Sequence, residues 1–173
     1  MKNVVGILAI IFAIGTASAQ EIESNTAGRN EIKGNLGYIP FEIAELSYER
    51  ILSKHIGIGL SGAYVFADNL VYRGWVLPYF RYYVAENREA EGFFLEGHSG
   101  VIFTSDTEQD FNLASFGEEI KGANFGFGIS VGGKFVSSGG FVGEINLGIG
   151  REFNDETSTE IYPRAGMTFG YQF

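Results

Sequence analysis

The chain has 173 residues, 21 acidic against 12 basic side chains, a net charge of −9 at pH 7 and no cysteine. This length suits one domain, and the absence of cysteine excludes a disulfide framework and thiolate metal sites. The acidic balance offers no electrostatic footprint for nucleic acid, so we expect no nucleic-acid partner.

The amino terminus has the order of a secretory signal peptide. Lys2 precedes an apolar core from Val4 to Ile14, and the small residues Ala17-Ser18-Ala19 follow. Because the core is too short for a transmembrane helix, we expect residues 1–19 to be a cleaved signal peptide, with a retained anchor as the alternative. Residues 20–30 are polar without periodicity, and we expect them to form a periplasmic tail.

From residue 31 onward, apolar and polar residues alternate with the period of two that is typical of strands. In the first half of this region we expect strands at 31–39, 42–52, 56–66 and 75–84, and Pro40 ends the first of them. Both faces of 75–84 are aromatic, so its register stays open by one residue. We place Arg81 on the polar face and Tyr82 on the apolar face.

The second half has the same alternation, with strands expected at 92–103, 123–135, 141–151 and 161–173. The last run covers roughly 13 residues, which is longer than the usual strand of about 5–6. A tilted strand needs about 9–11 residues to cross a bilayer, so this run is long enough to do so.

Eight strands with connections that mostly alternate between short and long predict an all-β fold, an eight-stranded antiparallel up-and-down transmembrane β-barrel over residues 31–173. The connections at 53–55 and 136–140 are short, whereas those at 67–74, 104–122 and 152–160 are longer. The turn at 85–91 is long for a periplasmic connection, which speaks mildly against this arrangement.

A soluble ligand-binding β-barrel such as a lipocalin has the same alternation. The composition of each face must therefore decide between a soluble barrel and a transmembrane barrel. The polar face of the strands carries charges of both signs among glycines and serines: Glu45, Glu49, Arg81, Glu96, Lys134, Glu144 and Arg164. Such a face cannot fill an apolar core. Buried charges are costly unless paired, and charges of both signs at matching heights can pair inside a barrel.

We therefore expect these residues to form an interior charge network, with the apolar face toward lipid. Lys134 and Glu144 would lie side by side in one hairpin, and Arg81 and Glu96 in another. Eight strands leave room only for side chains, so the barrel should be plugged rather than open.

The chain ends in Gly170-Tyr171-Gln172-Phe173. Together with the signal peptide and eight strands, this end resembles the small, porin-like outer-membrane β-barrels of Gram-negative bacteria, the class of OmpA transmembrane domains and OmpX. Leu46-Ser47-Tyr48-Glu49-Arg50, followed by a turn and a Gly-alternating strand, is similar to an uncharacterised small-barrel family in that class.

The resemblance implies an outer-membrane location, with outer-membrane lipids and lipopolysaccharide as surroundings. It also implies that Tyr171 and Phe173 form an assembly signal for the outer-membrane assembly machinery. No functional residue carries over.

The sequence offers little for catalysis. His55 lies in a turn, and His98 is expected inside the barrel beside Glu96, but Ser99 points to the opposite face. Lipid-A deacylase barrels carry His and Ser two apart on one strand, where this chain has Gly100. The GxGxxG order of a nucleotide fold is absent, and the acids of the loop 104–122 lack the offsets of a calcium loop. We expect no catalytic residue, no cofactor and no metal.

The sequence thus favours a non-enzymatic structural or surface-interaction protein of the outer membrane. Its outer loops, chiefly 104–122 and 152–160, would contact lipopolysaccharide or an extracellular protein partner at the cell surface. A lipid-modifying barrel enzyme that uses His98 with Glu96 is the alternative, and a soluble ligand-binding barrel is the second alternative.

Overall fold

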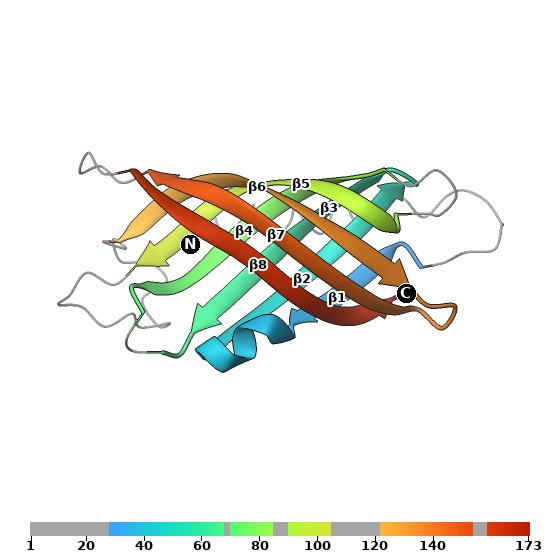
Figure 1. The fold of residues 1–173 in the computed structure, drawn as a ribbon, viewed down its shortest axis with the longest axis horizontal. Helices are drawn as coiled ribbons and strands as arrows, with labels where there is room; N and C mark the ends of the chain where they lie inside the picture. Colours follow the sequence, from blue (N-terminus) through green and yellow to red (C-terminus); the bar gives the residue numbers. More distant parts are fainter. Residues whose placement is uncertain (1–27, 68–69, 85–89, 105–121, 154–158) are drawn as a thin grey trace, which may run out of the picture.

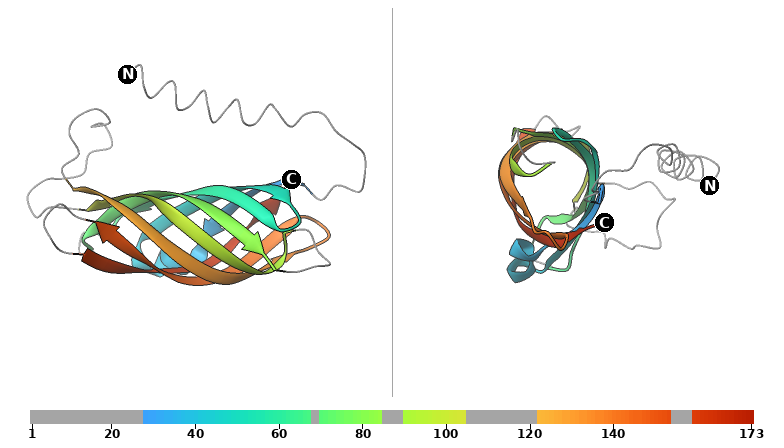
Figure 2. Two further views of the ribbon diagram at one scale, coloured as in Figure 1. Left: turned by 90° about the horizontal axis from the view of Figure 1, so that it is seen from above. Right: turned by 90° about the vertical axis from the view of Figure 1, so that its right-hand side faces the viewer.

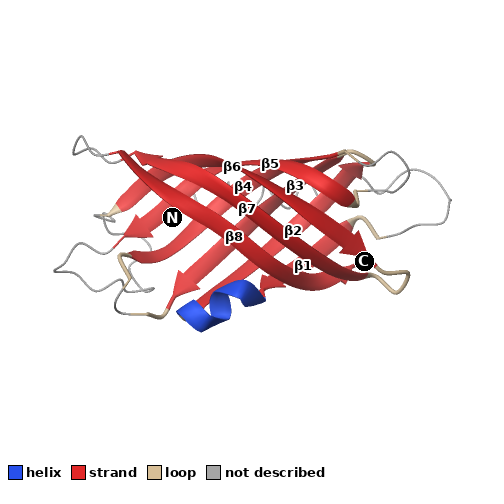
Figure 3. Ribbon diagram, in the orientation of Figure 1, coloured by secondary structure: helices blue, strands red, loops and turns tan. Residues whose placement is uncertain are grey.

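The computed structural model describes residues 28–67, 70–84, 90–104, 122–153 and 159–173. Eight antiparallel strands form one closed barrel in which each strand pairs with its sequence neighbours and the last pairs with the first (Figures 1 and 3). The strands are β1 (Asn30–Asn35), β2 (Ile43–Ser53), β3 (Ile56–Val65), β4 (Tyr72–Tyr83), β5 (Gly92–Thr104), β6 (Ala123–Val136), β7 (Phe141–Phe153) and β8 (Thr159–Gln172). The predicted eight-stranded antiparallel up-and-down β-barrel is confirmed.

The two ends of the barrel differ. At the termini end, the N–H of Asn30 donates to the carbonyl of Phe173 (3.0 Å) and the N–H of Phe173 donates to the carbonyl of Asn30 (2.8 Å), next to the tight β6–β7 turn. The opposite end, here called the loop end, carries a 3₁₀ helix, η1 (Leu36–Phe41), that connects β1 to β2. Figure 1 shows η1 at this opposite end, away from the carboxyl terminus.

Side chains alternate between a buried interior and an exposed exterior along the strands. In β4, Tyr79 and Arg81 are buried while Phe80 and Tyr82 are exposed, so the register of this strand is as expected. The exterior is apolar, as Ile129 (67% exposed) and Leu147 (64% exposed) illustrate. This polarity is the reverse of that of a soluble barrel, whose apolar side chains point inward.

Inward-facing glycines make room for large inward side chains. A Cβ added at Gly59 of β3 would collide with the ring of Tyr79, and one added at Gly150 of β7 would collide with the ring of Tyr162. Glycine-rich strands therefore lie beside strands with bulky inward residues, as is expected when eight strands leave just enough interior for side chains.

The first strand is shorter than its alternation predicts, so the boundary at residue 39 is wrong. β1 ends at Asn35, whose side chain accepts a hydrogen bond from the N–H of Gly37 and caps η1. Pro40 lies inside η1 rather than after a strand, and Glu42 follows in the left-handed region at φ 58°. The capping side chain competes with sheet pairing and turns the backbone before the predicted strand is complete.

Candidate functional site

The interior of the barrel holds a network of ion pairs, and Lys33 of β1 is one of its centres. The Lys33 ammonium donates to Glu49 (2.6 Å), Glu144 (3.0 Å) and Glu31 (3.1 Å), which come from β2, β7 and β1. An ammonium has three N–H donors, and all three are used here. Lys33 is 1% exposed, so its charge is compensated entirely by protein groups.

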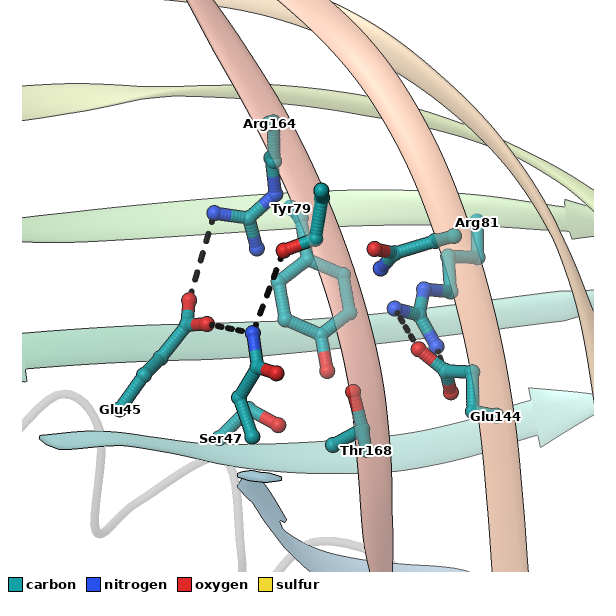
Figure 4. Close-up of a pocket in the computed structure, with 10 residues that line it drawn as sticks. Glu45, Ser47, Tyr79, Arg81, Glu144, Arg164 and Thr168 are labelled. Atoms are coloured by element: carbon teal, nitrogen blue, oxygen red, sulfur yellow. Dashed lines mark hydrogen bonds and ion pairs between the residues drawn. The ribbon is translucent and has the colours of Figure 1, made fainter. Parts of the chain in front are cut away.

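Arg81 of β4 is the second centre. Nη1 and Nη2 each lie 2.7 Å from one oxygen of Glu144, which gives the parallel, forked pairing that a guanidinium forms with a carboxylate. Nε donates to Glu96 (2.8 Å), and Nη1 also donates to Glu49 (2.9 Å). Figure 4 shows this pairing between Arg81 and Glu144 within the barrel.

Lys134 of β6 completes the network near the termini end. Its ammonium donates to Glu31 (2.8 Å) and lies 4.3 Å from the centre of the Tyr83 ring. Lys134 and Glu144 are register partners on neighbouring strands, as predicted. The ion pairs of the two residues run to other strands: Lys134 bonds Glu31, while Glu144 bonds Arg81 and Lys33 across the lumen.

Arg164 of β8 and Glu45 of β2 form the layer nearer the loop end (Figure 4). Arg164 reaches Glu45 (3.4 Å) and Glu96 (3.2 Å). Glu45 also accepts hydrogen bonds from Asn35 (2.7 Å), from the Trp75 indole (3.2 Å) and from the Ser61 hydroxyl. The network thus continues from the termini end to this layer.

The structure buries all seven residues that the sequence assigned to the interior and places each in an ion pair: Glu45, Glu49, Arg81, Glu96, Lys134, Glu144 and Arg164. Arg81 and Glu96 are register partners and pair at 2.7 Å, as expected. Sequence reasoning omitted Glu31 and Lys33 from the network. Their alternation with Ile32 was the available signal, because it puts both on the polar face of β1.

The network fills the charged part of the lumen. The cavity between Asn35, Tyr79, Arg81 and Glu144 measures about 10 Å³, which is about the space that one water molecule needs. The ion-paired residues come from seven of the eight strands, all except β3. Such an arrangement is suited to closing the barrel and holding its strands together.

His98 lies beside this network. Its Nδ1 is 3.4 Å from Glu96 Oε1, and its ring centre is 6.0 Å from that of Tyr162. The structure therefore brings His98 and Glu96 together inside the barrel, as their spacing predicts. Among the residues that the structure describes, no group of three His, Cys, Asp or Glu side chains is placed to hold a metal ion.

The remaining predicted features lie at the ends of the chain and in the loops. Tyr171 and Phe173 are exposed on the exterior at the termini end. The expected signal peptide, most of the tail at 20–30 and most of the loops 104–122 and 152–160 lie outside the described residues. No described helix has the length and apolar character needed to cross a membrane.

These features define the class: a closed, eight-stranded antiparallel barrel with an ion-paired interior and an apolar exterior. The chain belongs to the family DUF3575, described as a protein of unknown function, whose family model matches residues 7–168. Comparison with curated proteins and with solved structures found no match in either. The family and the fold agree with the sequence-based expectation of an uncharacterised small-barrel family.

Proposed function

We propose that the protein is a non-enzymatic structural barrel of the Gram-negative outer membrane, held in lipid by its apolar exterior and closed by its charged interior. The reversed polarity of the barrel carries this proposal. A water-soluble barrel would expose its charges and bury its apolar side chains, whereas here Lys33 and Arg81 are buried while Ile129 and Leu147 are exposed.

The strand lengths support the same location. β4 to β8 are 12 to 14 residues long, and a tilted strand needs about 9–11 residues to cross the hydrocarbon layer. In the closed sheet, backbone N–H and C=O groups of neighbouring strands bond each other, which is required where lipid hydrocarbon offers them no partner. The resemblance to the OmpA and OmpX class adds the expectation that Tyr171 and Phe173 form the signal for the assembly machinery.

Within this proposal the barrel serves as an anchor that presents its loops at the cell surface. The charged part of the lumen is filled by side chains rather than left open, so we expect no transport along the barrel axis. Lipopolysaccharide or an extracellular protein is the partner we expect at the loop end, which lies opposite the periplasmic termini.

Membrane fractionation followed by semi-native electrophoresis of the full-length protein tests the proposed location. We expect the protein in the outer-membrane fraction, with faster migration before heating than after, because a closed barrel stays compact in detergent until it is heated. A soluble periplasmic protein without this shift would contradict the proposal and favour the soluble ligand-binding barrel.

The non-enzymatic part of the proposal has its own test. His98 contacts Glu96 at 3.4 Å, so this pair is where barrel catalysis would reside. We expect cells that express the wild-type protein or His98→Ala to have the same lipid-A profile by mass spectrometry. A lipid-A species that depends on wild-type His98 would establish the enzyme instead.

A further inference from the structure

The barrel wall is incomplete at the loop end between β8 and β2. β1 pairs with β8 only as far as Asn35, opposite Thr168. β8 extends beyond this point to Thr159, and β2 starts at Ile43, but among the described residues no strand lies between these two ends. The 3₁₀ helix η1 occupies this region and lies outside the ring of strands (Figure 2, right). The barrel therefore has a lateral opening here.

Side chains stabilise the β8 edge in place of a neighbouring strand. The N–H of Ala165 donates to the Tyr38 hydroxyl (3.2 Å), and the N–H of Met167 donates to Asn35 Oδ1 (3.1 Å). Asn35 Nδ2 donates to the Ala165 carbonyl (3.3 Å). Pro163, two residues before Ala165, has no N–H that needs a partner on this side. The edge at Ala165 and Met167 is thus satisfied by side chains with the opening in place.

A cavity of about 350 Å³ lies at this opening, within the range of about 300–1,000 Å³ found for small-molecule sites. Its lining includes Trp75 and Leu77 from the interior and the outward-facing residues Pro163 and Ala165 of β8. The Tyr38 ring of η1 meets the Trp75 ring edge-on, with centroids 5.7 Å apart. The cavity therefore passes through the wall and is continuous with the apolar exterior.

The cavity is apolar on its walls and ends at a charge-compensated floor. Leu77, Ile102 and Tyr162 form an apolar cluster at its inner side. Arg164 also lines it, but its guanidinium already bonds Glu45 and Glu96. The floor therefore provides no preference for an anionic head group, so a ligand would insert its apolar part and leave its polar part outside.

We infer that this cavity binds one acyl chain of an outer-leaflet membrane lipid, which enters sideways between β8 and β2 with its head group outside. This inference rests on the proposed membrane location, because that location places lipid chains against Pro163 and Ala165. A lipid is the occupant that fits, since the opening lies on the same apolar face that lipid would cover.

Trp75 provides the probe, because it is the single tryptophan of the chain and lines the cavity. The full protein is folded into phosphatidylcholine vesicles whose acyl chains are brominated, since bromine quenches tryptophan only at short range. We expect strong quenching of Trp75. Ala165→Phe, which fills the opening, should lower it severalfold, whereas Ala123→Phe, on the exterior of β6 at the same end, should leave it unchanged. Equal quenching in both variants would overturn the inference.

Two reporters in a Trp75→Phe background separate the possible failures. Ile129→Trp faces outward and should be quenched in any membrane-embedded barrel, so its failure would contradict the proposed location itself. Tyr79→Trp faces inward in the charged layer and measures quenching through an intact wall. If Trp75 is quenched no more than a tryptophan at 79 while the outward reporter is quenched, only the acyl-chain site is wrong.

A further arm distinguishes the source of the chain. A brominated free fatty acid is added to the protein in vesicles of unbrominated phosphatidylcholine. We expect Trp75 to be quenched in the vesicles of brominated phosphatidylcholine described above. Quenching by the free fatty acid alone would show that the cavity takes a free acid and would overturn the assignment to a membrane lipid.

Discussion

At the scale of single residues, the interior depends on cations that each serve several carboxylates. Lys33 contacts Glu31, Glu49 and Glu144 with one ammonium group. Removing that ammonium takes one cation away from all three carboxylates, which are buried and cannot be solvated by water instead. Removal of one partner of a buried ion pair is therefore more costly than removal of a pair at the surface.

We predict that Lys33→Met lowers the free energy of unfolding by about 3–5 kcal/mol, the usual cost of breaking a buried ion pair. Lys54→Met is the matched control, because Lys54 is exposed in the β2–β3 turn and such changes usually stay within about 0.5 kcal/mol. Urea unfolding in vesicles, followed by Trp75 fluorescence, measures both. Equal losses in the two variants would show that the network does not stabilise the barrel.

The sequence predicted which residues face inward but only part of their pairing. Alternation fixes the face of each residue, and hairpin geometry fixes its neighbours, so Arg81 with Glu96 was within reach of sequence reasoning. Lys134 and Glu144 are also register partners, yet each bonds a residue on another strand. Long side chains in a narrow lumen reach across it, and that choice depends on closure of the barrel rather than on local sequence.

At the scale of elements, β1 and η1 set the shape of the wall. Alternation in the sequence continues through Leu36 and Tyr38, so period two alone predicts a strand that the backbone does not form. Asn35 decides the outcome, because its side chain bonds both the start of η1 and the edge of β8. A capping side chain at a strand end is a weak sequence signal, which is why the opening in the wall was not predicted.

We predict that Asn35→Ala loosens this edge, since the partly buried N–H of Met167 loses its acceptor, and even a fully buried unsatisfied group costs only about 1–3 kcal/mol. Amide hydrogen exchange in micelles should be faster at Met167 and unchanged at Ile149 in the middle of β7. Asn30→Ala, at the termini end, serves as the control and should leave Met167 unchanged. If Met167 exchanges at the same rate in all three proteins, Asn35 does not hold the β8 edge.

At the scale of the whole molecule, the barrel reverses the polarity of a soluble protein. The interior carries the charges and the exterior carries most of the large apolar side chains, an order that alternation and face composition predict. Because the two faces differ by one residue step along each strand, any probe that separates water from lipid should report a period of two.

Spin labels on β7 test this account most directly, and the absence of native cysteine makes single-cysteine variants clean. Labels are placed at Ile145, Asn146, Leu147 and Ile149 of the protein folded in vesicles, and collisions with oxygen and with a water-soluble nickel chelate are compared. We predict high oxygen and low nickel accessibility at 145, 147 and 149, and low values for both at 146. High nickel accessibility at the three outward positions would place water against the exterior and contradict the proposed membrane location.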